Sequence, residues 1–156
     1  MGGLFSGILL GALALILVSA GIEDARAREI ANWKNALIAL LAPAWWVAAG
    51  LSPWPDMAVQ IGVAAIVFAL FTVAFAFGQM GGGDVKMIGA LALWLPAPSL
   101  FWMLVLMSLL GGALTLLMLI EHRLRKPAAA LEVPYGVAIA MATLLTLREP
   151  ILNQFG

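Results

Sequence analysis

The sequence predicts an all-α integral membrane protein with six transmembrane helices, and three observations predict this fold class. Of the 156 residues, 64% are hydrophobic and 10% are charged, whereas a soluble domain carries roughly 25% charged residues. The apolar residues gather into six separate stretches, as helices that cross a bilayer require. The basic residues crowd into alternate loops. We therefore expect a single membrane domain over residues 1–156, without a separate soluble core.

The six predicted spans follow one another with short loops between them. They are 4–21, 36–51, 57–77, 85–95, 100–120 and 133–147. A spanning helix needs about 20 mostly apolar residues, so the short segment 85–95 is the unusual one. Pro43 predicts a kink in the second span. The first span ends in small residues that resemble a signal-peptidase site, but no basic residue precedes Leu4, so we interpret it as a retained helix.

The positive-inside rule predicts that the N-terminus lies outside. Seven basic residues fall in the loops after the first, third and fifth spans, and Arg148 alone falls on the other side. The seven are Arg26, Arg28, Lys34, Lys86, Arg123, Arg125 and Lys126. If 85–95 did not cross, the basic residues would divide evenly between the two faces, so the asymmetry favours six spans. Trp54, Trp94 and Trp102 near the outer ends, with Trp33 near the inner face, match an interfacial aromatic belt.

Composition excludes several kinds of chemistry. The chain has no cysteine and a single histidine, His122, so disulfides, thiol nucleophiles and multi-histidine or cysteine-ligated metal centres are excluded. Eight basic residues balance eight acidic ones, which leaves no surplus for binding nucleic acid. We expect no cofactor and no metal, and chemistry carried by carboxylates, hydroxyls or backbone groups.

Asp84 is the first acidic residue that stands out. It follows Gly81-Gly82-Gly83, which permit unusual backbone angles and close approach of another chain, and it precedes the short helix 85–95. Such a helix reaches only about 16 Å, so one of its ends is drawn toward hydrocarbon depth, where a carboxylate is expensive and usually functional. A plain helix cap is the structural alternative.

Asp24 is the second, at the end of the first span in a charged juxtamembrane segment. A solvated charged face would account for it alone. The topology, however, brings Asp24 and Asp84 to the same membrane face at similar depth. Two carboxylates that share one proton can act as base and acid in hydrolysis, and the pair would titrate as a unit.

These two segments resemble those of the type IV prepilin peptidases, the membrane aspartic proteases of the Gly-x-Gly-Asp class. Gly81-Gly82-Gly83-Asp84-Val85-Lys86 is similar to the family's second aspartate motif. Asp24-x-Arg26-x-Arg28-x-Ile30-x-Asn32 is similar to the first, except that Ala31 replaces the usual proline. Pro134-Tyr135-Gly136 is similar to the signature of the last helix.

The resemblance implies an aspartic endopeptidase that removes the basic leader of a prepilin, just before its hydrophobic helix, on the cytoplasmic side of the inner membrane. Larger members carry a cysteine-rich insertion between the first spans and also methylate the new N-terminus. This chain lacks that insertion, so we expect the peptidase-only form, similar to those of tight-adherence (Flp) pili, without methyltransferase activity. The expected partners are the prepilin and the lipid bilayer, and a homo-oligomer is left open.

The resemblance also assigns roles to individual residues. Asp24 and Asp84 would form the catalytic pair, while Gly81 and Gly83 would shape the substrate loop. Support or substrate-binding roles fall to Arg26, Arg28, Asn32, Lys86 and Tyr135, although membrane anchoring explains the three basic residues and the tyrosine equally well. The rival function is a small transporter or proton-conducting protein in which both aspartates carry protons. A purely structural subunit would leave the motifs unexplained.

Overall fold

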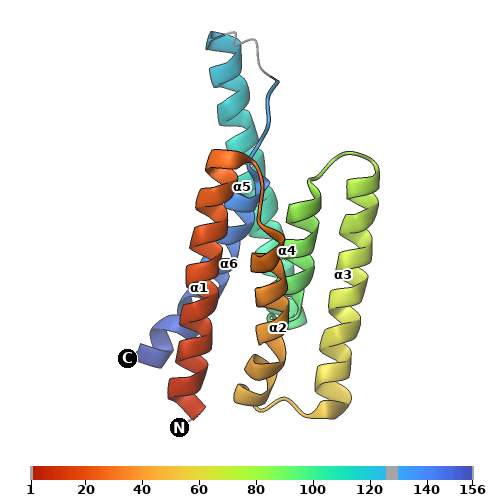
Figure 1. Cartoon of the computed structure of the whole chain (residues 1–156), viewed down its shortest axis with the longest axis vertical. Coiled ribbons are helices and arrows are strands. Elements are labelled where there is room, and N and C mark those ends of the chain that lie inside the picture. Colours follow the sequence, from red (N-terminus) through yellow and green to blue (C-terminus); the bar gives the residue numbers. More distant parts are fainter. Residues whose placement is uncertain (1, 126–129, 156) are drawn as a thin grey trace.

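A computed structural model describes the backbone of residues 2–125 and 130–155, and the side chains of residues 3–125 and 130–148. The described part of the chain is helical and contains no strand. The α-helices are α1 (Gly2–Ala27), α2 (Asn32–Ala48), α3 (Ala58–Ala76), α4 (Gly82–Ala92), α5 (Ala97–Arg125) and α6 (Tyr135–Phe155). An irregular turn at Pro53–Met57, in which Trp54 is extended, leads into α3. They run alternately up and down in one bundle (Figure 1).

Each of the six predicted spans corresponds to one α-helix, but the boundaries differ in two places that matter for the site. The first helix continues to Ala27, so the loop to α2 comprises only residues 28–31. The fourth helix begins at Gly82, before Asp84. Three helical stretches are long and apolar enough to cross a membrane, namely Gly3–Ala27, Pro53–Ala76 and Ala97–Arg125. Helix α2 continues through Pro43, and Lys126 lies outside the described residues.

The short helix α4 lies at the centre of the bundle. Every residue from Met87 to Ala92 is buried, and α4 packs against α2, α3 and α6. A helix of this length ends inside the protein, where its last carbonyl groups need hydrogen-bond donors. Gln60 Nε2 supplies them to the carbonyls of Ala92 and Leu95, at 2.7 and 2.6 Å.

Two tryptophans complete this buried end of α4. Trp46 Nε1 donates to the Leu93 carbonyl at 2.7 Å, and Trp94 Nε1 donates to the Ile38 carbonyl at 2.8 Å. Trp45 stacks on Trp94 with ring centroids 5.7 Å apart. The prediction that Trp94 belongs to a membrane-interface belt was therefore wrong, because its indole is 3% exposed and ties α4 to α2. Hydropathy alone does not separate a buried tryptophan from an interfacial one.

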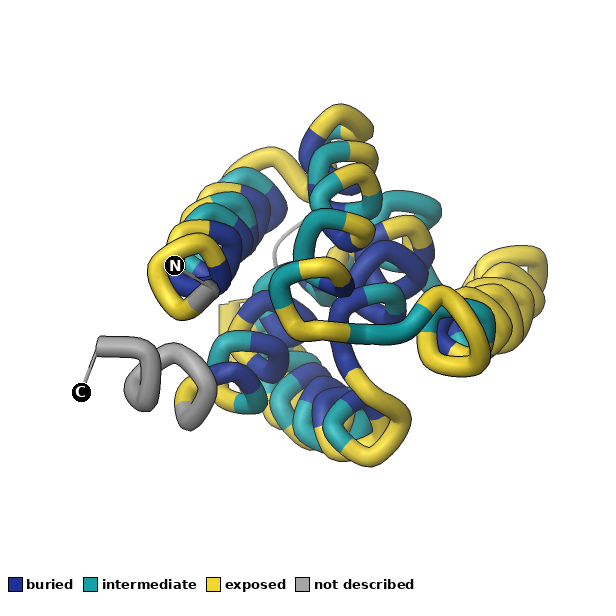
Figure 2. Tube along the Cα trace, turned by 90° about the horizontal axis from the view of Figure 1, so that it is seen from below, coloured by how far each residue is buried: buried dark blue, intermediate teal, exposed yellow. Residues whose placement is uncertain are grey.

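The outer surface of the bundle is apolar. Exposed residues lie on the outward sides of the helices and buried residues on the inward sides (Figure 2). Large exposed side chains such as Leu4, Leu15 and Ile66 would be unfavourable against water but match a hydrocarbon solvent. Trp33, Trp54 and Trp102 are also exposed, as the expected aromatic belt requires. Together with the long apolar helices, this surface indicates a multi-pass membrane protein.

Candidate active site

Asp24 and Asp84 line one polar cavity of about 410 Å³ at the upper end of the bundle in Figure 1. The rest of its wall comes from the loop between α1 and α2 and from Gly81, Gly82 and Gly83. We call this space the carboxylate cavity. The structure thus brings the two aspartates, 60 positions apart in the sequence, into one enclosure. In the described part of the chain, no three His, Cys, Asp or Glu side chains gather to hold a metal ion.

Asp84 is held by the first turn of α4. The N-cap residue is Gly81, so Asp84 occupies the third helical position and not the cap itself. Its carboxylate accepts a hydrogen bond from the Gly81 backbone amide, which is the return half of a capping box. Burial raises the pKa of Asp84, and the negative charge of Asp24 raises it further, to about 6. Asp84 thus lies just before the buried residues of α4.

The three glycines before Asp84 serve close packing. None of them has a positive φ, so the expected unusual backbone angles are absent; the left-handed residue of this loop is Gly78, with φ 69°. A Cβ on Gly83 would lie 3.4 Å from Ile30 Cβ and 3.7 Å from the Ile30 backbone nitrogen. The loop between α1 and α2 therefore passes directly over Gly83, which brings the segment that follows Asp24 next to Asp84.

Asp24 is held by the start of α6. Its side chain is 5% exposed, and the backbone amides of Gly136 and Val137 face its carboxylate and donate to it. Oxygen Oδ2 has no hydrogen-bond partner among the described residues. A Cβ on Gly136 would lie 2.9 Å from this oxygen and 2.7 Å from Ile30 Cδ1. Glycine at 136 is thus required for the aspartate to fit, a role that sequence reasoning did not assign.

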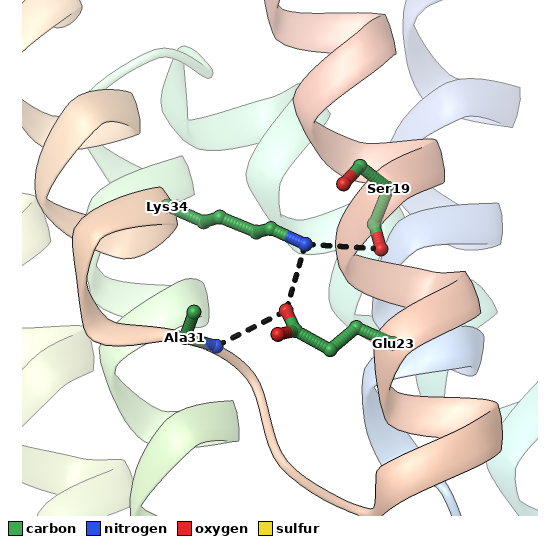
Figure 3. A network of polar contacts seen from close by, with 4 residues as sticks. All are labelled: Ser19, Glu23, Ala31 and Lys34. Carbon is green, nitrogen blue, oxygen red and sulfur yellow. Dashed lines mark hydrogen bonds and ion pairs between the residues drawn. The ribbon is translucent and has the colours of Figure 1, made fainter.

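An ion pair between α1 and α2 holds the loop that covers the cavity (Figure 3). Lys34 Nζ lies 2.7 Å from Glu23 Oε2 and donates to the Ser19 carbonyl at 3.2 Å. The same Glu23 oxygen accepts from the Ala31 amide at 3.2 Å. Because the Lys34 side chain is 8% exposed, removing Glu23 would leave a buried ammonium group without its ion-pair partner. The sequence interpretation had treated Lys34 only as a basic residue of the inner face.

A second contact missed at the sequence level joins α2 to the glycine loop. Asn35 Nδ2 donates to the Gly83 carbonyl at 3.1 Å, next to Asp84. The Asn35 side chain is buried, and its Oδ1 has no hydrogen-bond partner in the described part of the chain. An amide next to a lysine, both in the first turn of an otherwise apolar helix, is the signal that would have identified it.

The remaining predicted site residues divide into two groups. Arg28 and Asn32 line the carboxylate cavity, and Arg28 has a positive φ of 58°. Lys86 lies at its edge, where Nζ donates to Asn32 Oδ1 at 2.8 Å. Arg26 is exposed and does not line the cavity. Tyr135 begins α6, and its ring packs where a Cβ of Gly111 in α5 would lie, so it joins two helices and does not line the cavity.

Comparison with known families supports the sequence resemblance. Residues 11–116 match the model of the type IV leader peptidase family. The match covers both aspartates and more than half of the chain. The chain belongs to this family. No curated protein and no solved structure gives a significant match. Membership implies an aspartic-type leader peptidase that acts on prepilin substrates in a membrane environment.

Proposed function

We propose that the chain is a membrane-embedded endopeptidase in which Asp24 and Asp84 form the catalytic pair, and that it cleaves the leader from a type IV prepilin of the Flp kind. One observation carries the proposal: in a member of the leader peptidase family, both aspartates line a single polar cavity at one end of an apolar bundle. The transporter alternative lacks comparable support, because the cavity at the opposite end, around Trp46 and Gln60, is lined by no carboxylate among the side chains that the structure describes.

The chemistry follows from two carboxylates that share one proton. The ionised aspartate takes a proton from a water molecule as its oxygen attacks the scissile carbonyl, while the protonated aspartate donates a hydrogen bond to the carbonyl oxygen. The protonated aspartate passes its proton to that oxygen, so the carbon of the tetrahedral intermediate bears two hydroxyl groups. The aspartate that took the water proton then gives it to the leaving amine as the C–N bond breaks, and the other aspartate takes a hydroxyl proton as the C=O bond re-forms, which returns the pair to its singly protonated state. Burial raises the pKa of both Asp24 and Asp84, which favours a proton held by the pair as a unit.

The proposal places the carboxylate cavity at the cytoplasmic face of the inner membrane, with the N-terminus outside and six helices crossing. The positive-inside asymmetry supports this orientation. Helix α4 extends only about 16 Å, which is shorter than the membrane, so its buried end would lie inside the bundle and not at the outer membrane surface. The loop of residues 28–31 between α1 and α2 leaves no room for a cytoplasmic insertion, which supports a peptidase without methyltransferase activity.

Co-expression with an Flp-type prepilin tests the proposal. The wild type is expected to produce a pilin without its leader, as measured by gel shift and intact mass. Asp24→Asn and Asp84→Asn are each expected to leave the precursor intact. Asp56→Asn is the matched control, because Asp56 is a carboxylate bonded to Ser52 outside the carboxylate cavity. Cleavage by the Asp84→Asn variant would overturn the assignment, and an unmodified new N-terminus would agree with the absence of methylation.

A further inference from the structure

A second cavity of about 520 Å³ adjoins the carboxylate cavity and has a different character. It is an open groove between α2 and α3, with α4 as its floor. Its wall is formed largely by small residues, which are Ala36, Ala39, Ala64, Ala65, Gly89 and Ala90. We call it the small-residue groove. Small side chains allow the backbone of another helix to approach closely in a membrane.

The small-residue groove and the carboxylate cavity meet at one residue. Asn32 lines both spaces, and Lys86, which hydrogen-bonds to Asn32, stands at their junction. Asn35 lines the groove at the same end, and its side chain is 4% exposed with Oδ1 unpartnered in the described structure. A polypeptide that leaves the carboxylate cavity past Asn32 would thus reach the end of the groove that Lys86 and Asn35 line.

The dimensions match a helical occupant. The lining residues extend from Asn32 to Ala39 on α2 and from Lys86 to Leu93 on α4, which is about 10 Å on each helix at 1.5 Å per residue. This length accommodates about two turns of an incoming helix. Phe68 of α3 lines the groove and packs its ring onto Gly89 of α4, where a Cβ would lie 2.6 Å from the ring, so an incoming helix would contact this ring.

We infer that the small-residue groove binds the apolar transmembrane helix of the substrate, immediately beyond the cleavage site, and so sets which peptide bond lies between Asp24 and Asp84. The inference rests on the proposed function, since it assigns the groove to the same substrate. The occupant is a helix with a peptide extension at the cytoplasmic end, because only a continuous chain uses both the apolar groove and the polar cavity that it joins.

The test fills the groove without touching the carboxylate cavity. Ala65 is exposed on α3 and lines the groove, so Ala65→Trp adds bulk there without disturbing the core. The matched control is Ala113→Trp, because Ala113 is exposed on α5 and lies outside the groove. Two substrates are compared in detergent micelles, a full prepilin and a soluble peptide that carries the leader and cleavage site but lacks the apolar helix.

Ala65→Trp is expected to raise KM for the full prepilin at least about tenfold and to leave kcat/KM for the soluble peptide unchanged. Ala113→Trp is expected to change neither value. An unchanged KM for the full prepilin, with the wild type active, would overturn the groove assignment and leave the proposed function standing. If the wild type cleaved neither substrate, both would fall.

Cross-linking gives an independent readout that does not depend on turnover. The chain has no native cysteine, so a single Ala65→Cys can be introduced into the inactive Asp84→Asn background and oxidised with prepilins that carry one cysteine in the apolar helix. We expect a disulfide at positions within about two turns of the cleavage site, and none with Ala113→Cys. If a lipid acyl chain occupied the groove instead, no cross-link would form, and that result would contradict the inference.

Discussion

Replacing Gly136 by alanine should displace the Asp24 carboxylate without removing any ionisable group from the chain. The added Cβ would lie 2.9 Å from Asp24 Oδ2 and 2.7 Å from Ile30 Cδ1, whereas ordinary contacts begin at 3.4 Å. The carboxylate must therefore retreat by about 0.5 Å or rotate. Because a misplacement of about 1 Å can cost about 10²-fold in rate, we expect kcat to fall at least about tenfold. Overpacking should also cost about 1–3 kcal/mol of stability.

The assay separates these two effects. Ile30→Val removes Cδ1, so the double variant Gly136→Ala with Ile30→Val relieves one of the two close contacts but not the one to Asp24. We expect the melting temperature in detergent to recover partly and kcat to stay low. Gly112→Ala is the neutral control, because nothing lies within 4 Å of its Cβ position. Full activity of the Gly136→Ala variant would refute the argument that this glycine positions Asp24.

Three further predictions concern the cavity and its supports. Activity should fall as pH rises through about 6, because Asp84 then loses the proton that the pair requires; a flat profile across that range, measured as kcat/KM, would argue against it. Glu23→Gln should lower the melting temperature more than Lys34→Met, because it leaves a buried ammonium group without its partner. Lys34→Met leaves instead a carboxylate that is one-third exposed, and the reverse order of melting temperatures would contradict the buried ion pair. Asn35→Ala should change stability little, because it removes one hydrogen bond and one unpartnered oxygen together. It should lower kcat about tenfold, because the Gly83 carbonyl next to Asp84 loses its donor. An unchanged kcat would show that this contact does not position Asp84.

Sequence patterns predicted the helices of this fold because a helix that crosses a membrane must be a long run of apolar residues. All six apolar stretches form helices, and the motif residues Asp24, Gly81, Gly83, Asn32 and Asp84 were assigned before any geometry was known. The place of Asp84 depends on where its helix begins, which hydropathy does not fix. Asp84 lies within the first turn and not at the cap, because the helix begins at Gly82.

The supporting contacts could not be predicted, because each depends on where two distant helices meet. Gly136 was visible as part of a motif, but its closeness to Asp24 arises only when α6 packs against α1. Lys34 and Asn35 are adjacent polar residues at the start of an apolar helix, and their partners Glu23 and Gly83 lie on separate elements. Trp94 likewise became a buried donor because α4 ends inside the bundle.

The central claim is that Asp24 and Asp84 together perform peptide hydrolysis, and turnover by purified protein tests it most directly. Wild type, Asp24→Asn and Asp84→Asn would be compared in detergent on one Flp-type prepilin, with leader release followed by mass spectrometry and folding followed by melting temperature. The account predicts that both variants remain folded and that the kcat of each falls by about 10²-fold to 10⁴-fold, the range for the loss of a positioned acid or base. A folded variant of either aspartate that releases the leader at the wild-type rate would contradict it.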